Sequence, residues 1–155
     1  MLRIDYSRLS FLVIDGDRVS QRILSTLLGA FGVRDVAVAG DSSAGIAAAF
    51  AQRPDIVLMD WGLPRREAFE VVANLRGESS LDPAVPIIGL SGHVREADVT
   101  TARDAGVTDF LAKPISADTL HQRIVSVLVR PREFVSAPAY RGPDRRRLPR
   151  DGTGK

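Results

Sequence analysis

The stretch Pro54-Asp55-Ile56-Val57-Leu58-Met59-Asp60-Trp61-Gly62-Leu63-Pro64 indicates a buried strand that ends in a carboxylate. An unbroken Ile-Val-Leu-Met run is typical of a strand covered on both faces in a parallel sheet, and Gly62 and Pro64 break the strand directly afterwards. Open sheets of this kind bind their ligands at the carboxyl ends of the strands. Asp60 is therefore placed where a reacting group would lie, although on this segment alone a loop-capping Asp is an equally good interpretation.

Four more apolar segments predict strands, and each strand is followed by a segment with helical periodicity. The strands are expected at residues 9–14, 35–39, 87–90 and 109–112. Helices are expected around 23–31, from an N-cap at Ser42, around 69–75, from about 95 to 105, and after an N-cap at Ser116. Five strands alternating with five helices predict an α/β fold, a doubly wound five-stranded parallel sheet, because short right-handed connections leave few other topologies.

The expected fourth helix, from about Arg95 to Ala105, has a thinner apolar face than the others. This face consists of small side chains, namely Ala97, Val99, Ala102 and Ala105. A helix with so little apolar surface to bury is held weakly, so we expect its position to be adjustable.

The composition is that of an ordinary globular protein. The chain has 155 residues, of which 45% are hydrophobic and 26% are charged, and it contains no cysteine. These values predict one domain, residues 1–130, with an appended arm, residues 131–155. No apolar run reaches the roughly 20 residues that a bilayer requires, and the amino terminus lacks the features of a secretion signal. Without disulfides or a membrane segment, we expect a cytoplasmic location and no membrane partner.

The arm differs from the body in charge and in proline content. Residues 131–155 hold seven of the 21 Lys and Arg residues and three of the 19 Asp and Glu residues, so the arm is about +4 and the body about −2. Its prolines predict an extended segment, with docked and disordered forms both open. We expect a homodimer in which each arm buries Phe134 and Tyr140 on the other chain, while Arg145 to Arg147 meet acids of the body. One Arg cluster without base readout predicts no specific nucleic-acid partner.

Polar side chains follow four of the expected strands. Asp15 and Asp17, Asp60, Ser91 and Lys113 all fall at the carboxyl edge of one sheet. Taken singly, the first two acids are ordinary helix caps, Ser91 is a turn residue and Lys113 is a solvated cation. Together, the carboxylates favour Mg²⁺, and the hydroxyl and the ammonium suit the oxygens of a phosphoryl group. Asp60 would then be a nucleophile that forms an acyl phosphate.

With these residues in register, the chain resembles the receiver domain of two-component response regulators over about Ser10 to Arg130. The resemblance implies a flavodoxin-like fold and a signalling protein that is not an enzyme. It also implies that a sensor histidine kinase or a phosphotransfer protein phosphorylates Asp60. Asp15, Asp60 and the backbone carbonyl of Gly62 would bind the Mg²⁺ that accompanies this reaction.

The resemblance extends to residues that respond to the phosphoryl group. Ser91 would take up the phosphate, Lys113 would contact it, and Phe110 occupies the place of the aromatic switch residue, three positions before the lysine. Pro64, four residues after the nucleophile, also fits the family pattern. The expected function is that of a single-domain response regulator, which signals through a changed surface.

One position departs from the family pattern. Family members usually carry two adjacent acids after the first strand, and the second position here is Gly16. The missing carboxylate should weaken Mg²⁺ binding, unless the flexible Gly16 lets Asp17 act as a substitute ligand. The same departure favours an alternative function, a receiver-like interaction module that works without phosphorylation.

Overall fold

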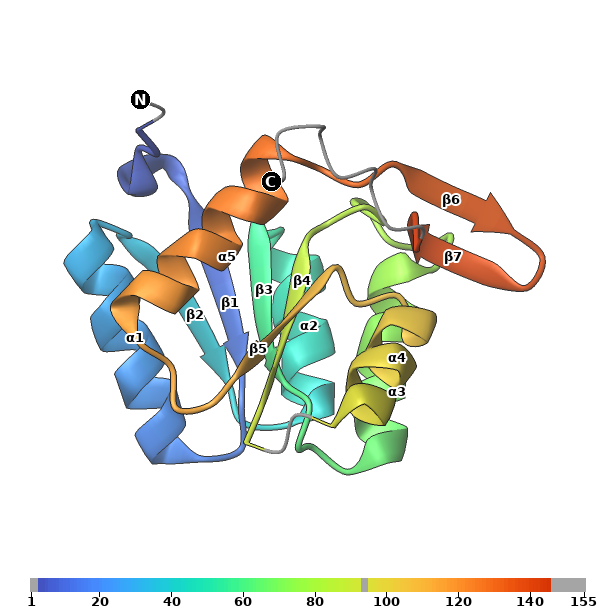
Figure 1. The fold of residues 1–155 in the computed structure, drawn as a ribbon, viewed down its shortest axis with the longest axis horizontal. Coiled ribbons are helices and arrows are strands. Elements are labelled where there is room, and N and C mark those ends of the chain that lie inside the picture. The colour runs from blue at the N-terminus through green and yellow to red at the C-terminus, as the bar shows by residue number, and fades with distance from the viewer. Residues whose placement is uncertain (1–2, 93–94, 146–155) are drawn as a thin grey trace, which may run out of the picture.

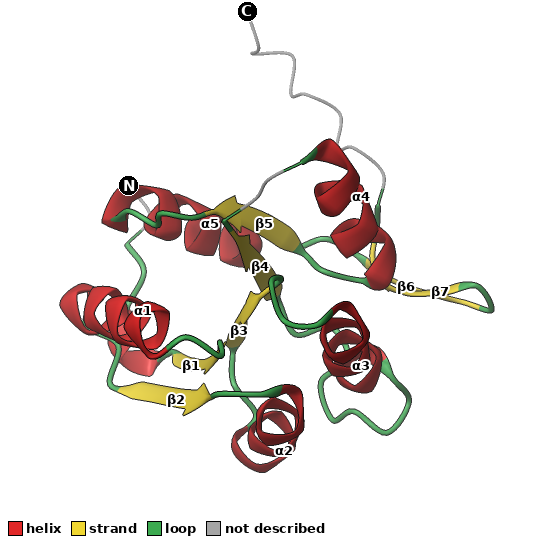
Figure 2. Ribbon diagram, turned by 90° about the horizontal axis from the view of Figure 1, so that it is seen from below, coloured by secondary structure: helices red, strands yellow, loops and turns green. Residues whose placement is uncertain are grey.

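The computed structural model describes residues 3–92 and 95–145. It contains a parallel five-stranded sheet in the order β2-β1-β3-β4-β5, with helices on both faces (Figures 1 and 2). The elements of the doubly wound domain are η1 (Tyr6–Arg8), β1 (Ser10–Ile14), α1 (Arg18–Phe31), β2 (Asp35–Ala39), α2 (Ser42–Gln52), β3 (Ile56–Asp60), α3 (Arg65–Arg76), β4 (Ile87–Ser91), α4 (Glu96–Ala105), β5 (Asp109–Ala112) and α5 (Ala117–Val129). The predicted fold class is therefore confirmed.

Two apolar layers hold the sheet between the helices. Alternate residues of β1 point to opposite faces, so Phe11 and Val13 pack with α1 and α5, whereas Leu12 and Ile14 pack with α2, α3 and α4. Figure 2 shows the same division, with α1 and α5 on one face and the other three helices opposite. The central strand β3 is buried on both faces, as its unbroken apolar sequence predicted.

Helix α4 is the least anchored of the helices, in agreement with its sequence. Ala102 is its only buried residue among the ten from Glu96 to Ala105. An alanine side chain removes little apolar area from water, so this helix gains little from the core. Its position therefore also depends on contacts outside the core.

One predicted helix start is wrong and another is confirmed. The N-cap of α2 is Asp41, not Ser42, because the Asp41 carboxylate accepts a hydrogen bond of 2.8 Å from the Ala44 amide, while Ser42 is already helical. Ser116 does cap α5, in a reciprocal pair with Thr119.

The arm is more ordered than the sequence suggested. It forms an antiparallel hairpin of β6 (Phe134–Ala137) and β7 (Tyr140–Pro143), joined by Pro138 and Ala139, which stands beside α3 and α4 in Figure 1. The backbone of the arm is extended, as expected. Its two strands pair with each other and pack on the body of the same chain. Exchange of arms between two chains stays a prediction, and Arg146 and Arg147 lie outside the described residues.

In the part of the chain that the structure describes, no helix is both long enough and apolar enough to cross a membrane.

Candidate functional site

The carboxyl edge of the sheet brings together three of the side chains that the sequence predicted there, Asp15, Asp60 and Lys113. Hydrogen bonds that continue past the strands hold the backbone of this edge: the Asp15 amide donates to the Ala39 carbonyl at 3.0 Å, and the Lys113 amide donates to the Ser91 carbonyl at 2.7 Å. Asp60 is the last residue of β3 and pairs with Leu90 of β4. Backbone hydrogen bonds and strand pairing therefore position the strand ends independently of their side chains.

The Lys113 ammonium lies between two carboxylates. Its Nζ is 3.0 Å from Asp15 Oδ2 and 3.5 Å from Asp60 Oδ1. The Asp15 side chain is 0% exposed, whereas those of Asp60 and Lys113 are 18% and 22% exposed. A fully buried carboxylate requires a charged or hydrogen-bonded partner, and Lys113 supplies the charge. Asp60 keeps a route to solvent, which a phosphoryl acceptor needs.

Backbone amides orient both carboxylates. The Gly62 amide donates to Asp60 Oδ1 at 3.0 Å, and the Asp17 amide donates to Asp15 Oδ1 at 2.9 Å. These hydrogen bonds fix the orientation of each carboxylate. For Asp15, the second oxygen is left to Lys113. For Asp60, the ion pair with Lys113 uses the same oxygen, Oδ1, that accepts from Gly62.

Asp17 has a different role from Asp15 in this structure. Its Oδ1 accepts from the Val19 amide at 2.9 Å, so it is the N-cap of α1. This is the ordinary role that the sequence left open for it, and its role as a substitute metal ligand stays a prediction. Among the described residues, no three acidic or histidine side chains group in a way that could hold a metal ion.

The donor set at this edge nevertheless fits a magnesium ion with few protein ligands. Mg²⁺ prefers oxygen, keeps several waters and is often bound by only one or two carboxylates. Asp15 and Asp60 supply two carboxylates, which both form ion pairs with Lys113. The backbone carbonyl of Gly62 lies two residues after Asp60 in the sequence. A side chain at Gly16 is sterically allowed, since an added Cβ would lie 3.5 Å from the Gly40 carbonyl oxygen. Steric hindrance therefore does not explain why an acidic residue is missing at position 16.

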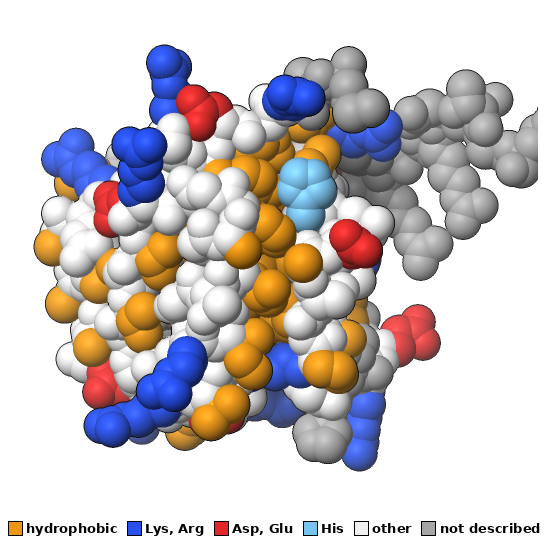
Figure 3. All heavy atoms as spheres, turned by 90° about the vertical axis from the view of Figure 1, so that its left-hand side faces the viewer, with side chains coloured by type: hydrophobic (Ala, Val, Ile, Leu, Met, Phe, Trp, Pro, Cys, Tyr) orange, Lys and Arg blue, Asp and Glu red, His pale blue; other side chains and the backbone are white. Residues whose placement is uncertain are grey.

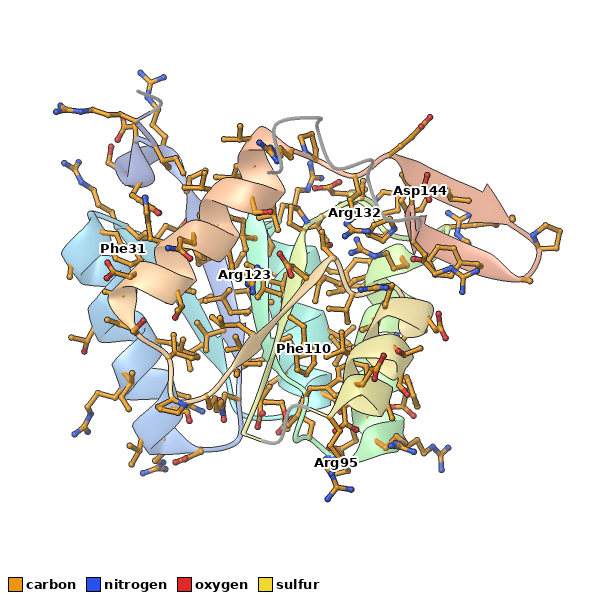
Figure 4. All side chains as sticks on the ribbon, in the orientation of Figure 1. Phe31, Arg95, Phe110, Arg123, Arg132 and Asp144 are labelled. Atoms are coloured by element: carbon orange, nitrogen blue, oxygen red, sulfur yellow. The ribbon has the colours of Figure 1, made fainter. Side chains whose placement is uncertain are left out.

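Ser91 and Phe110 lie on the two strands that lead to this edge. Ser91 ends β4 and is buried, and its carbonyl accepts from Lys113. The Phe110 ring lies between β5 and α4, where the absence of a side chain at Gly89 leaves room for it (Figure 4). A small pocket next to this ring is lined by residues of α4 and the arm, including Val99, Ala102 and Arg132. The switch roles of Ser91 and Phe110 stay predictions.

Two residues of α1 belong to the site and were missed in the sequence. Ser20 Oγ accepts from Lys113 Nζ at 3.2 Å, and Gln21 Nε2 donates to the Asp15 carbonyl at 2.5 Å. The N-cap at Asp17 was a usable signal, because it sets Ser20 and Gln21 one turn into the helix, facing the strand ends.

Comparisons with known proteins agree with this geometry. The sequence pattern of the Response regulator receiver domain matches residues 11–125. The KDP operon transcriptional regulatory protein KdpE of Escherichia coli is 34% identical over 127 residues, which are 82% of this chain and 54% of that protein. The probable transcriptional regulatory protein TcrX of Mycobacterium tuberculosis is 33% identical over 84% of this chain and 54% of its own length. The chain thus spans about half the length of these relatives.

Solved structures show the same fold. The Vibrio cholerae chemotaxis protein CheY4 superposes with a TM-score of 0.70 at 25% identity, covering 77% of this chain and 98% of that one. The receiver domain of the sensor histidine kinase PA1611 from Pseudomonas aeruginosa superposes with a TM-score of 0.66 at 29% identity, covering 76% and 94%. That domain was solved with a magnesium ion coordinated in its active site cleft.

Proposed function

Because this chain belongs to the response regulator receiver domain family, we propose that it takes a phosphoryl group on Asp60 from a phosphohistidine in a two-component phosphorelay. Receiver domains are signalling modules that interact with sensor histidine kinases or phosphotransfer proteins. The observation that carries the proposal is the position of Lys113 Nζ, 3.0 Å from Asp15 and 3.5 Å from Asp60. This arrangement supplies a partly exposed nucleophile, a buried second acid and a cation between them.

The transfer uses these groups in distinct roles. One Asp60 oxygen attacks phosphorus, the P–N bond of the phosphohistidine breaks, and its electron pair stays on the imidazole nitrogen. The Lys113 ammonium offsets negative charge on the transferred oxygens, and Asp15 holds that ammonium in place. Mg²⁺ held by Asp15, Asp60 and the Gly62 carbonyl would add further charge neutralisation when bound. Ser91, at the end of the neighbouring strand, would hydrogen-bond the new phosphoryl oxygens.

A surface for the phosphohistidine partner adjoins this edge. Val19 and Ile23 of α1 are 65% and 48% exposed, and Ile23 lines a largely apolar groove that includes Lys113 and Ile115. Figure 3 shows apolar side chains in a band on the side of the molecule that carries α1. Exposed apolar side chains beside a reactive edge suit the apolar face of a partner helix. We assign this groove to the kinase or phosphotransfer protein.

A homodimer through the arm is a further part of the proposal. The hairpin contacts that the structure has within one chain could also form between two chains, since symmetric exchange preserves them. Sedimentation velocity of the full chain should then show twice the chain mass. A species of single-chain mass at all concentrations would contradict the dimer without affecting the phosphoryl site.

Beryllofluoride, a phosphoryl mimic, discriminates this function from a phosphorylation-independent interaction module. With Mg²⁺ present, it should change the fluorescence of Trp61, which adjoins the nucleophile and is the only Trp in the chain. Asp60→Asn should remove the response. Asp55→Asn is the matched control, because Asp55 lies just before the other end of β3 and accepts from Ser10. A parent protein that does not respond, or a response that persists in Asp60→Asn, would overturn the proposal.

A further inference from the structure

Helix α4 connects the phosphoacceptor edge to the C-terminal hairpin. It begins at Glu96, five residues after Ser91, and ends at Ala105, on the side of the molecule where the hairpin lies (Figure 1). Its ten residues span about 15 Å at 1.5 Å per residue. Since Ala102 is its only buried residue, contacts outside the core contribute much to where it sits. One end follows Ser91, and the hairpin holds the other.

The hairpin contacts the carboxyl-terminal end of α4 through its backbone. Gly106, the C-cap of α4, has φ +115°, and Gly142 of β7 lies against it. A Cβ on Gly142 would lie 3.1 Å from Gly106 Cα, and one on Gly106 would lie 3.3 Å from the Arg141 carbonyl oxygen. A side chain at Gly142 would crowd Gly106 and the Tyr140 ring, and the positive φ of Gly106 favours glycine there. Gly142 is buried.

Side chains of the arm fasten this contact. Arg141 Nε donates to the Arg76 carbonyl at the end of α3 at 3.0 Å. Arg145 pairs with Asp104 of α4 at 3.2 Å and stacks over Tyr140, with 4.1 Å from its guanidinium carbon to the ring centroid. These contacts tie the hairpin to both helices at once.

The base of the hairpin also touches the proposed switch face. Arg132 donates to the Asp144 carbonyl at 2.9 Å, and the Asp144 amide donates to the Glu133 carbonyl at 2.7 Å, which closes the hairpin. Arg132 also lines the pocket beside Phe110, together with Val99 and Ala102 of α4 (Figure 4). A change in the Phe110 ring or in α4 would therefore disturb the residue that closes the hairpin.

We propose that the docked hairpin is a clamp that holds α4 in the arrangement without a phosphoryl group, so that hairpin docking and phosphorylation of Asp60 oppose each other. This inference rests on the proposed function. In the arrangement described, Lys113 pairs with the free Asp60 carboxylate at 3.5 Å, and the hairpin fits closely against the end of α4. Any ligand that moves α4 must break these contacts, and linkage makes the effect reciprocal: a loosened hairpin favours the phosphorylated state.

Gly142→Val in the full chain tests the clamp, because its side chain occupies the space of Gly106 and Tyr140. Trypsin cleavage within the arm should accelerate in this variant, and the dissociation constant for beryllofluoride with Mg²⁺, read from Trp61, should fall about fivefold or more. In the parent, beryllofluoride should likewise accelerate cleavage in the arm. Gly29→Ala on α1, where an added Cβ meets nothing within 4 Å, is the matched control and should leave both values unchanged.

Arg141→Met supplies a second, milder variant should Gly142→Val fold poorly, since it removes the hydrogen bonds to Arg76 and Ser136 without adding bulk. It should show the same two changes at smaller size, with cleavage followed at the other arginines of the arm because the variant lacks the trypsin site at Arg141. Faster cleavage with an unchanged or raised dissociation constant would overturn the clamp, and so would unchanged cleavage in both variants. A parent that binds no beryllofluoride would instead overturn the proposed function on which the clamp depends.

Discussion

The two edges of the sheet each hold a partly or fully buried cation, and the two cations are stabilised in different ways. Lys113, at the carboxyl edge, lies between two carboxylates and is 22% exposed. Arg76, at the end of α3, is 2% exposed and binds neutral groups: the carbonyls of Pro83, Val85 and Gly106, and the hydroxyl of Thr108. The carboxylate partners of Lys113 can bind a metal or a phosphoryl group in its place. The carbonyl partners of Arg76 are held in position by the backbone.

Burial destabilises the charged form of Arg76. Loss of solvent lowers the pKa of Arg76 to about 10, although Tyr140 of the hairpin and Asp82 raise it. Burial likewise raises the pKa of Tyr140, while Arg145 and Arg76 lower it. The carbonyl partners offset the lost hydration of the guanidinium, and together they join α3, the loop before β4, the turn after α4 and the start of β5. We call this set of Arg76 contacts, at the amino-terminal ends of the strands, the brace. Its role is structural, whereas the carboxyl edge is the reactive site.

The largest effect is expected for Arg76→Met. The variant leaves three carbonyls without this donor, those of Gly106 and Val85 buried and that of Pro83 partly buried. Each buried group costs about 1–3 kcal/mol, partly offset by removal of the buried charge. We expect the free energy of unfolding in urea to fall by about 3 kcal/mol. Arg66→Met on the same helix is the control, since Arg66 is 92% exposed, and it should change the value by less than about 0.5 kcal/mol. Equal stabilities of the two variants would contradict the brace.

Lys113→Ala should reduce the conformational response, read from Trp61, more than it reduces the phosphorylation of Asp60. The ammonium holds Asp15, offsets charge during the transfer and reads the phosphoryl group, but it does not attack, so phosphorylation by acetyl phosphate should persist, slowed by up to about a hundredfold. The unfolding free energy should fall by about 1–2 kcal/mol, because Asp15 loses its charge partner while the partly exposed site admits water. The Trp61 response should be lost; a full response in this variant would show that another group reads the phosphoryl group.

Gly16→Asp should sharpen the reactive edge by restoring a carboxylate. The backbone of Gly16 does not have a positive φ, so a side chain is accepted there. An added oxygen ligand should tighten Mg²⁺ by about tenfold, or about 1.4 kcal/mol. Gly16→Asn is the matched control of equal size and should bring a smaller gain. Unchanged Mg²⁺ affinity in Gly16→Asp, measured by Trp61 quenching, would mean that the metal ligands are wrongly assigned.

Asp17→Asn separates the two roles open to Asp17. Asn is as good an N-cap as Asp, so α1 should keep its stability. If Asp17 serves only as the cap seen in the structure, Mg²⁺ affinity should stay within about twofold of the parent. A clear loss of Mg²⁺ affinity at constant stability would show that Asp17 is recruited to the metal.

The smallest effect is expected for Ser20→Ala. Ser20 gives Lys113 a neutral third acceptor at 3.2 Å, and a hydrogen bond of this kind contributes about 0.5–1.5 kcal/mol. Phosphoryl uptake from acetyl phosphate should slow by about threefold, and Ser20→Thr should restore it. No recovery with Thr would mean that Ser20 acts through helix packing and not through the ammonium.

The sequence predicted the reactive edge because strand ends mark it. Asp15, Asp60, Ser91 and Lys113 each follow an apolar run, and a parallel sheet brings such positions together. Ser20 was missed because its role depends on the N-cap of α1 at Asp17, six residues before the apolar periodicity becomes visible at Ile23.

The opposite edge could not be predicted in the same way. The partners of Arg76 are backbone carbonyls, which every residue carries and no pattern marks. The hairpin was interpreted as an extended arm because its strands have four residues each and its prolines and arginines dominate the composition. Its docking depends on Gly106 and Gly142 facing each other, a tertiary contact between distant positions.

The most direct measurement of the central claim is the intact mass of the protein after incubation with acetyl phosphate and Mg²⁺. We expect that the parent gains the mass of one phosphoryl group, that peptide analysis places it on Asp60, and that Asp60→Asn gains none while Asp55→Asn still does. A parent that gains no mass, or an Asp60→Asn variant that does, would contradict the assignment of the carboxyl edge as a phosphoacceptor site.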